Sequence, residues 1–227
     1  MTLYLLSEEL SFPSPRLADS NGLLAVGGDL SMERLVLAYQ MGIFPWYSEE
    51  TPILWWSPDP RLVLFPGDLH ISRSLKRVVD KGVFGITFDT AFDRVISECA
   101  ACRAKGDGTW IVPEMIAAYM KLHEAGVAHS VEAWCGNDLV GGLYGVSLGK
   151  CFFGESMFSL VSNASKVALA SLVSFVKKRD FDFVDCQVTN SHLLRMGAKE
   201  ISRDAFLEML EKSISGATCH GNWKSDG

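Results

Sequence analysis

Two short stretches place carboxylates inside patterns that are otherwise typical of buried strands. The first is GESMFS, where Glu155 stands among glycine, methionine and aromatic residues, and the second is FDFVDCQV, which contains Asp185 and Gln187. Buried carboxylates are rare unless they have a partner. Because side chains alternate along a strand, we expect Glu155 to share a face with Met157 and Ser159, and Asp185 and Gln187 to lie about 7 Å apart on one face.

The helix expected between these two strands, residues 163–179, would let them lie side by side as a crossover unit. Glu155, Asp185 and Gln187 would then converge near one end of the sheet, and Gly154 would leave a gap where a ligand can approach. One interpretation is that each acid pairs with a nearby Lys or Arg and only stabilises the fold. The other is a functional site, because two neighbouring acids need a cation, which a substrate can supply.

Length and composition limit the class of protein. The chain has 227 residues, 48% of them hydrophobic, and a formal net charge of −6. This suits one large domain, or a main domain with a smaller one attached, and it excludes a generally basic nucleic-acid coat while allowing a local basic patch. The first residues lack the basic start of a signal peptide, and no apolar run is long enough to span a bilayer.

The six cysteines are scattered along the chain, which fits a reducing cytosol better than a disulfide framework. Cys99 and Cys102 form a single C-x-x-C motif with no second pair at zinc-ribbon spacing, so we expect them to pack in the core.

The pattern of elements predicts an α+β fold with a mixed sheet. Capping residues, stop glycines and apolar periodicity indicate helices over 31–42, 71–82, 90–105, 113–126, 163–179, 191–197 and 202–214. Strands are expected over 84–89 and 181–188, with an antiparallel meander over 128–159. A segment dense in aromatics and prolines ends near residue 60, so we expect a small N-terminal domain, 1–60, and a larger domain, 61–227.

Several longer motifs make the sequence resemble the leucyl/phenylalanyl-tRNA–protein transferases. They are NGLLAVGGDLS, GIFPWYS, PILWWSPDPR, HISRSLKR, GTWI, AYMKLHEAGVAHSVE, LVGGLYGV, FFGESMFS, NASK and DCQV, which run from residue 21 to about residue 190. The resemblance implies transfer of Leu, Phe or sometimes Met from aminoacyl-tRNA to the N-terminal Arg or Lys of a protein. That transfer marks the acceptor for degradation in the bacterial N-end rule pathway.

The resemblance also implies a small N-terminal domain followed by a larger domain like the acetyltransferases of the GNAT superfamily, with a mostly antiparallel sheet flanked by helices. We expect no cofactor and no metal, and a monomeric cytoplasmic protein without membrane contact. The expected partners are aminoacyl-tRNA and proteins or peptides with N-terminal Arg or Lys.

By resemblance, eight residues match the pocket for the donor amino acid: Leu143, Phe152, Gly154, Met157, Ser159, Leu169, Leu172 and Val176. Leu143, Leu172 and Val176 depart from the larger residues usual at these positions. Smaller aliphatic side chains in the pocket wall would shift the preference among Leu, Met and Phe as donor amino acids. A one-methylene difference is worth only about 1–3 kcal/mol, so we do not predict strict selectivity. Ordinary core packing is the alternative for each of these side chains.

Two further surfaces are assigned to tRNA. By resemblance, Trp46 and Trp110 match the family's tryptophans that contact the terminal adenosine of tRNA, as expected for unstacked bases held on aromatic faces. Arg73, Lys76 and Arg77 share one helical face, which suits contacts to the phosphates of the acceptor stem. They lie in the segment from residue 61 to residue 81, which has five basic and two acidic side chains, and a solvated charged face is the alternative interpretation.

The reaction itself makes modest demands on the protein. Aminolysis of an activated ester needs no covalent enzyme intermediate, so positioning and oxyanion stabilisation would carry most of the rate. We expect Asp185 and Glu155 to act as counter-charges for the acceptor. The amide oxygen of Gln187 would accept a hydrogen bond from the attacking amine, with Asp185 orienting the amide.

Two rival functions remain at this point. One is a GNAT-type N-acetyltransferase that uses acetyl-CoA, because residues 103–108 fit the R-x-x-G-x-G pyrophosphate pattern. That pattern requires a preceding strand and a helix opening directly from it, whereas here it ends a predicted helix. The other is a non-catalytic module that binds tRNA or N-degrons, which would need no arrangement of Asp and Gln.

Overall fold

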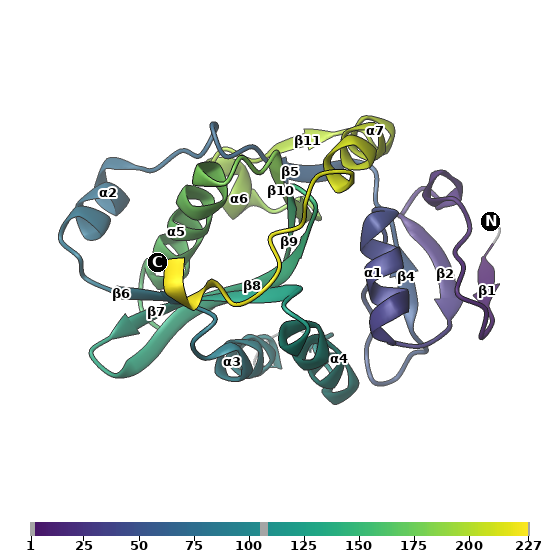
Figure 1. Cartoon of the computed structure of the whole chain (residues 1–227), viewed down its shortest axis with the longest axis horizontal. Coiled ribbons are helices and arrows are strands. Elements are labelled where there is room, and N and C mark those ends of the chain that lie inside the picture. The colour runs from purple at the N-terminus through teal and green to yellow at the C-terminus, as the bar shows by residue number, and fades with distance from the viewer. Residues whose placement is uncertain (1–2, 105–108, 227) are drawn as a thin grey trace.

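The computed structural model describes residues 3–104 and 109–226 and shows an α+β fold, as predicted (Figure 1). A small sheet has the strand order β1-β2-β4-β3, with β1 (Tyr4–Leu6) parallel to β2 (Leu23–Gly27). β4 (Leu54–Trp56) lies antiparallel to both β2 and β3 (Phe44–Pro45). Helix α1 (Met32–Gln40) covers this sheet and begins at Ser31, whose hydroxyl accepts a hydrogen bond from the backbone of Arg34.

A larger sheet forms the centre of the molecule, with the order β11-β5-β10-β9-β8-β7-β6. Its strands are β5 (Arg61–Leu64), β6 (Gly85–Phe88), β7 (Ala128–Cys135), β8 (Asp138–Leu148), β9 (Cys151–Ser159), β10 (Phe183–Gln187) and β11 (Lys199–Ile201). The β9–β10 pair is parallel and the other described neighbours are antiparallel. The sheet is therefore mixed and mostly antiparallel, and the predicted meander and crossover unit are both confirmed.

Helices cover both faces of the larger sheet. They are α2 (Arg73–Asp80), α3 (Phe92–Ala104), α4 (Pro113–Glu124), α5 (Ala164–Lys178), α6 (Ser191–Arg195) and α7 (Arg203–Ile214). Helix α5 packs on one face, and α3 and α4 pack on the other, so that each face has its own apolar core (Figure 1). None of the described helices combines the length and the apolar composition that a membrane span requires.

The small sheet and the larger sheet share one apolar core. The ring of Tyr39 in α1 lies 5.2 Å from the ring of Phe153 in β9, and Trp55 of β4 belongs to the same buried cluster. The strands of the small sheet end at Trp56, and β5 begins at Arg61 in the larger sheet. A boundary near residue 60 would lie in the short connection between them.

Strand β9 contains a bulge at Glu155, which changes the side-chain pattern expected from the sequence. Tyr144 of β8 pairs with Ser156 and Gly145 pairs with Gly154, so Glu155 is an extra residue in β9. Glu155 contacts α4, whereas Met157 packs against the core around α5. The prediction that Glu155 shares a face with Met157 and Ser159 is therefore wrong, because the bulge interrupts the alternation.

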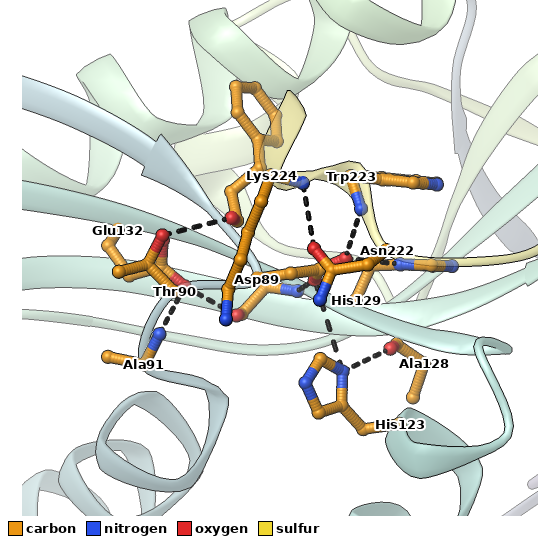
Figure 2. Close-up of polar contacts among 12 residues, drawn as sticks. Asp89, Thr90, Ala91, His123, Ala128, His129, Glu132, Asn222, Trp223 and Lys224 are labelled. Carbon is orange, nitrogen blue, oxygen red and sulfur yellow. Dashed lines mark hydrogen bonds and ion pairs between the residues drawn. The ribbon is translucent and has the colours of Figure 1, made fainter. Parts of the chain in front are cut away.

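A buried polar cluster anchors the C-terminal segment to the edge of the larger sheet (Figure 2). The carboxylate of Asp89 accepts hydrogen bonds from the backbone nitrogens of Ser130 (2.9 Å) and Trp223 (2.8 Å) and from Nδ1 of His129 (2.9 Å). Burial opposes the charge on Asp89, but the contacts from His129 and these backbone groups lower its pKa below the usual value. The Trp223 ring stacks on the His129 imidazole at 3.7 Å, so the C-terminal segment is part of the core.

Candidate active site

A cavity of about 660 Å³ opens where β9 and β10 separate. The two strands pair in parallel as far as Phe153 and Asp185, after which β9 continues to Ser159 paired with β8. Gly154 lies at this point, and a Cβ atom there would meet the carbonyl oxygen of Asp185 at 3.5 Å. The cavity walls come from β8, β9, β10, α5, α6, the end of α3 and the segment that includes Trp46.

One wall of the cavity is apolar and contains most of the residues predicted for the donor pocket. The cavity is lined by Leu143, Phe152, Gly154, Met157, Ser159, Leu169 and Leu172. Val176 does not line the cavity and packs in the core around α5. Ser159 is exposed, and its hydroxyl donates to the carbonyl of Val161 (2.8 Å).

Glu155 is a cavity-lining carboxylate without a basic partner among the described residues. Its Oε1 accepts a hydrogen bond from Nε2 of Gln187, and its Oε2 accepts one from the hydroxyl of Tyr119, each at 2.8 Å. The Tyr119 hydroxyl is in turn hydrogen-bonded to the hydroxyl of Tyr39. Burial raises the pKa of Glu155 to about 7, although the tyrosine and glutamine contacts oppose the shift.

Asp185 has a different environment, because its carboxylate faces a cation of the protein itself. Its oxygens receive two hydrogen bonds from Arg61, from Nε at 2.9 Å and from Nη2 at 2.6 Å, and both side chains are buried. Arg61 also donates to the carbonyl of Gly42 and lies over the Phe206 ring at 4.4 Å. Asp185 does not line the cavity. The structure therefore does not support Asp185 as a free counter-charge for a substrate, since its charge is already neutralised.

The amide of Gln187 is oriented by Glu155 and not, as predicted, by Asp185. Asp185 accepts a hydrogen bond from the backbone nitrogen of Gln187 at 2.9 Å, and this helps to hold a residue whose φ is +62°. The pairing of β10 with β5 shifts register between these two residues, so the simple alternation fails here as well. Because Nε2 donates to Glu155, the Oε1 atom is the acceptor that Gln187 can still offer to a ligand.

The structure brings Trp46 and Trp110 to the same cavity. Trp46 is 41% exposed and is supported by Trp56, whose ring lies 5.8 Å away and whose Nε1 donates to the Trp46 carbonyl. Trp55 is fully buried and donates to the carbonyl of Gly27, so it is part of the core. Two aromatic faces thus remain available to a ligand.

Helix α2 carries the basic residues predicted to meet phosphates, and it lies apart from the cavity. Arg73, Lys76 and Arg77 are exposed, while Lys76 pairs with Asp80 at 3.2 Å. In Figure 1, α2 is at the end of the molecule opposite the small sheet. Arg61 does not contribute to this surface because it is buried with Asp185, so the exposed positive charge is smaller than the sequence suggested.

Three residues near Glu155 were not predicted from the sequence. Tyr39 and Tyr119 bring hydroxyls to Glu155 from helices α1 and α4, and Arg103 lines the cavity at the end of α3. A buried tyrosine needs a partner for its hydroxyl, but the sequence does not say which one. Arg103 belongs to the R-x-x-G-x-G pattern, of which residues 105–108 lie outside the described residues. The described residues contain no group of three or more His, Cys, Asp or Glu side chains placed to hold a metal ion.

Comparisons with solved structures return only partial overlaps. An aminoglycoside acetyltransferase from an uncultured soil metagenomic sample, in complex with sisomicin, is 14% identical with a TM-score of 0.39 and covers 50% of this chain and 84% of its own. The structure of L-PGS from Bacillus licheniformis is 10% identical with a TM-score of 0.40 and covers 74% of this chain and 53% of its own.

Sequence comparisons are far more specific. A family model described as leucyl/phenylalanyl-tRNA protein transferase matches residues 63–211, and the model of its N-terminal domain matches residues 28–59. Leucyl/phenylalanyl-tRNA–protein transferases from Syntrophobacter fumaroxidans and Legionella pneumophila are 58% and 53% identical to this chain. The alignments cover 100% and 96% of this chain, and 97% and 98% of the relatives. The chain therefore belongs to the leucyl/phenylalanyl-tRNA–protein transferase family and is an aminoacyltransferase.

Proposed function

We propose that the protein transfers Leu, Phe or Met from the 3′ end of aminoacyl-tRNA to the α-amine of a protein that begins with Arg or Lys. The observation that carries the proposal is one cavity that combines an apolar wall, two tryptophans and a carboxylate without a basic partner among the described residues. The apolar wall suits the donor side chain, and the tryptophans suit the terminal adenine. The added residue would mark the acceptor for degradation in the cytoplasm by the N-end rule pathway.

Glu155 is the counter-charge for the acceptor in this proposal. A buried carboxylate without a cation is costly, and its raised pKa of about 7 reflects that cost. An incoming guanidinium or ammonium group offsets the cost and favours the ionised form of Glu155. Either cation would serve, which accounts for acceptance of both Arg and Lys.

The transfer needs two substrates held in contact more than it needs a covalent intermediate. The α-amine nitrogen attacks the ester carbonyl carbon, the new C–N bond forms, and the bond to the ribose oxygen breaks. Oε1 of Gln187 accepts a hydrogen bond from the attacking amine and thereby orients the lone pair of the amine nitrogen toward the ester carbonyl. The amine gives up one proton, and the departing ribose oxygen takes one up, directly or through water.

The exposed residues Arg73, Lys76 and Arg77 of α2 would hold acceptor-stem phosphates.

The decisive experiment mixes the protein with Phe-tRNA and a peptide that starts with Arg, and measures the peptide mass. Addition of one Phe supports the proposal, while matched peptides starting with Lys or with uncharged citrulline test the need for a cation. A mass increase from acetyl-CoA would support an acetyltransferase instead. Binding of Phe-tRNA without any mass increase would support a non-catalytic module.

A Glu155→Gln variant tests which amino group the carboxylate holds. If Glu155 holds the acceptor side chain, the variant loses its preference for Arg over citrulline while its affinity for Phe-tRNA stays the same. If affinity for Phe-tRNA falls and the preference survives, Glu155 holds the donor α-ammonium, and its assignment to the acceptor is wrong.

A further inference from the structure

The cavity contains an arginine side chain to which the proposed function gives no role. Among the cavity-lining residues in the described part of the chain, Arg103 is the one with a permanent positive charge. His192 also lines the cavity, but burial and the nearby Lys166 and Arg195 lower its pKa, so its imidazole is neutral at pH 7. Arg103 lies in the last turn of α3, where the side chain can extend beyond the helix end.

Two contacts fix the Arg103 side chain at the cavity. Its Nε donates a hydrogen bond to the hydroxyl of Ser156 at 2.9 Å, and its guanidinium carbon lies 5.7 Å from the centre of the Trp110 ring. Neither contact neutralises the charge, and no carboxylate pairs with Arg103 within residues 3–104 and 109–226. The two terminal nitrogens of the guanidinium therefore remain as donors for a ligand.

The described residues of the cavity present one cation and one carboxylate to a ligand. Arg103 stands beside Trp110, whereas Glu155 stands beside Gln187. An acceptor cation is repelled by Arg103 and attracted by Glu155, and a phosphate has the opposite preference. An arginine fork matches the geometry of a phosphate and is often found next to an aromatic face that holds a base.

These contacts point to one part of the donor. We propose that Arg103 binds the phosphate that joins the terminal adenosine of the donor tRNA to the nucleotide before it. This rests on the proposed function, which places the terminal adenine on Trp46 and Trp110. The site is distinct from the basic surface of α2, which would meet phosphates of the acceptor stem and does not line the cavity.

The test compares two small donor analogues that differ only by this phosphate. Both carry phenylalanine in an amide link to the 3′ position of adenosine, and one of them also has a 5′-phosphate. Calorimetry should show that wild-type protein binds the phosphorylated analogue about tenfold more tightly, with the gain falling as salt rises. Arg103→Gln should abolish the gain and leave affinity for the unphosphorylated analogue unchanged. Arg73→Gln is the matched control, and it should keep the full gain.

Each outcome bears on a different statement. If neither analogue binds wild-type protein, the proposed donor site fails and the phosphate contact fails with it. If both bind equally well, or if the gain survives in Arg103→Gln, only the assignment of Arg103 is overturned. If Arg103→Gln loses both analogues, Arg103→Lys decides, because it keeps the charge without the fork. A gain that survives in Arg103→Lys, reduced or in full, supports the phosphate contact, and absence of the gain in that variant contradicts it.

Discussion

Replacement of Glu155 by Gln should stabilise the protein at pH 8 while it impairs transfer. The pKa of this carboxyl rises from 4.5 to about 7 in the folded protein, mainly because it is buried. A raised carboxyl pKa favours folding at low pH and penalises it as the pH rises through the folded value. The shift corresponds to a penalty of about 3 kcal/mol at pH 8 and less than about 1 kcal/mol at pH 5.

The amide of the variant has no charge to bury, so it escapes this penalty. Its oxygen can accept from Gln187, and its NH₂ can donate to the Tyr119 hydroxyl, which then donates to Tyr39. Allowing about 1 kcal/mol for the exchanged hydrogen bonds, we expect a net gain of about 2 kcal/mol at pH 8 and no gain at pH 5. Urea unfolding at the two pH values measures both quantities.

Asp185→Asn provides a matched control in the neighbouring strand. Because Asp185 neutralises the buried Arg61, its loss should destabilise the protein by about 3–5 kcal/mol at pH 8. The two substitutions would then change the free energy of unfolding in opposite directions at pH 8. A Glu155→Gln variant that is less stable than wild type at pH 8, or whose advantage does not shrink toward pH 5, would refute this reasoning.

Three further predictions concern activity. Below pH 7, log kcat/KM for an Arg-starting peptide should fall with a slope approaching two, because Glu155 and the acceptor amine must both lose a proton; Glu155→Gln should leave a slope of about one. Leu172→Phe should shift the ratio of Phe to Leu transfer, because Leu172 lines the cavity. Position 176 does not line it, so Val176→Phe should instead lower the free energy of unfolding in urea by about 1–3 kcal/mol. Arg73→Gln with Arg77→Gln should weaken tRNA binding and lower its dependence on salt in a titration, and an unchanged slope removes α2 from the interface.

Local signals predicted the elements of this fold well. Ser31 caps α1, Pro113 opens α4, and the apolar stripe of α5 faces the sheet, because each of these features depends on residues only a few positions apart. The parallel pairing of β9 and β10 also followed from the helix between them.

Sequence reasoning failed where the environment of a residue depends on a partner far away in the chain. Asp185 meets Arg61 across 124 positions of the chain, and Glu155 meets the hydroxyl of Tyr119 across 36. The bulge at Glu155 depends on how β9 pairs with β8, which strand periodicity does not contain. Periodicity therefore found the polar residues of the site but could not tell the neutralised acid from the one without a cation.

The bulge in β9 has a consequence for how this protein can be altered genetically. Phe153, Glu155 and Ser156 all face the α3 and α4 side, and Met157 lies on the α5 side, as it would in a regular strand that lacked Glu155. Loss of the single codon for Glu155 would thus restore regular pairing without turning any other side chain of β9 to the wrong face. The fold of β9 does not depend on Glu155, so deletion of its three-nucleotide codon should leave a folded and inactive protein.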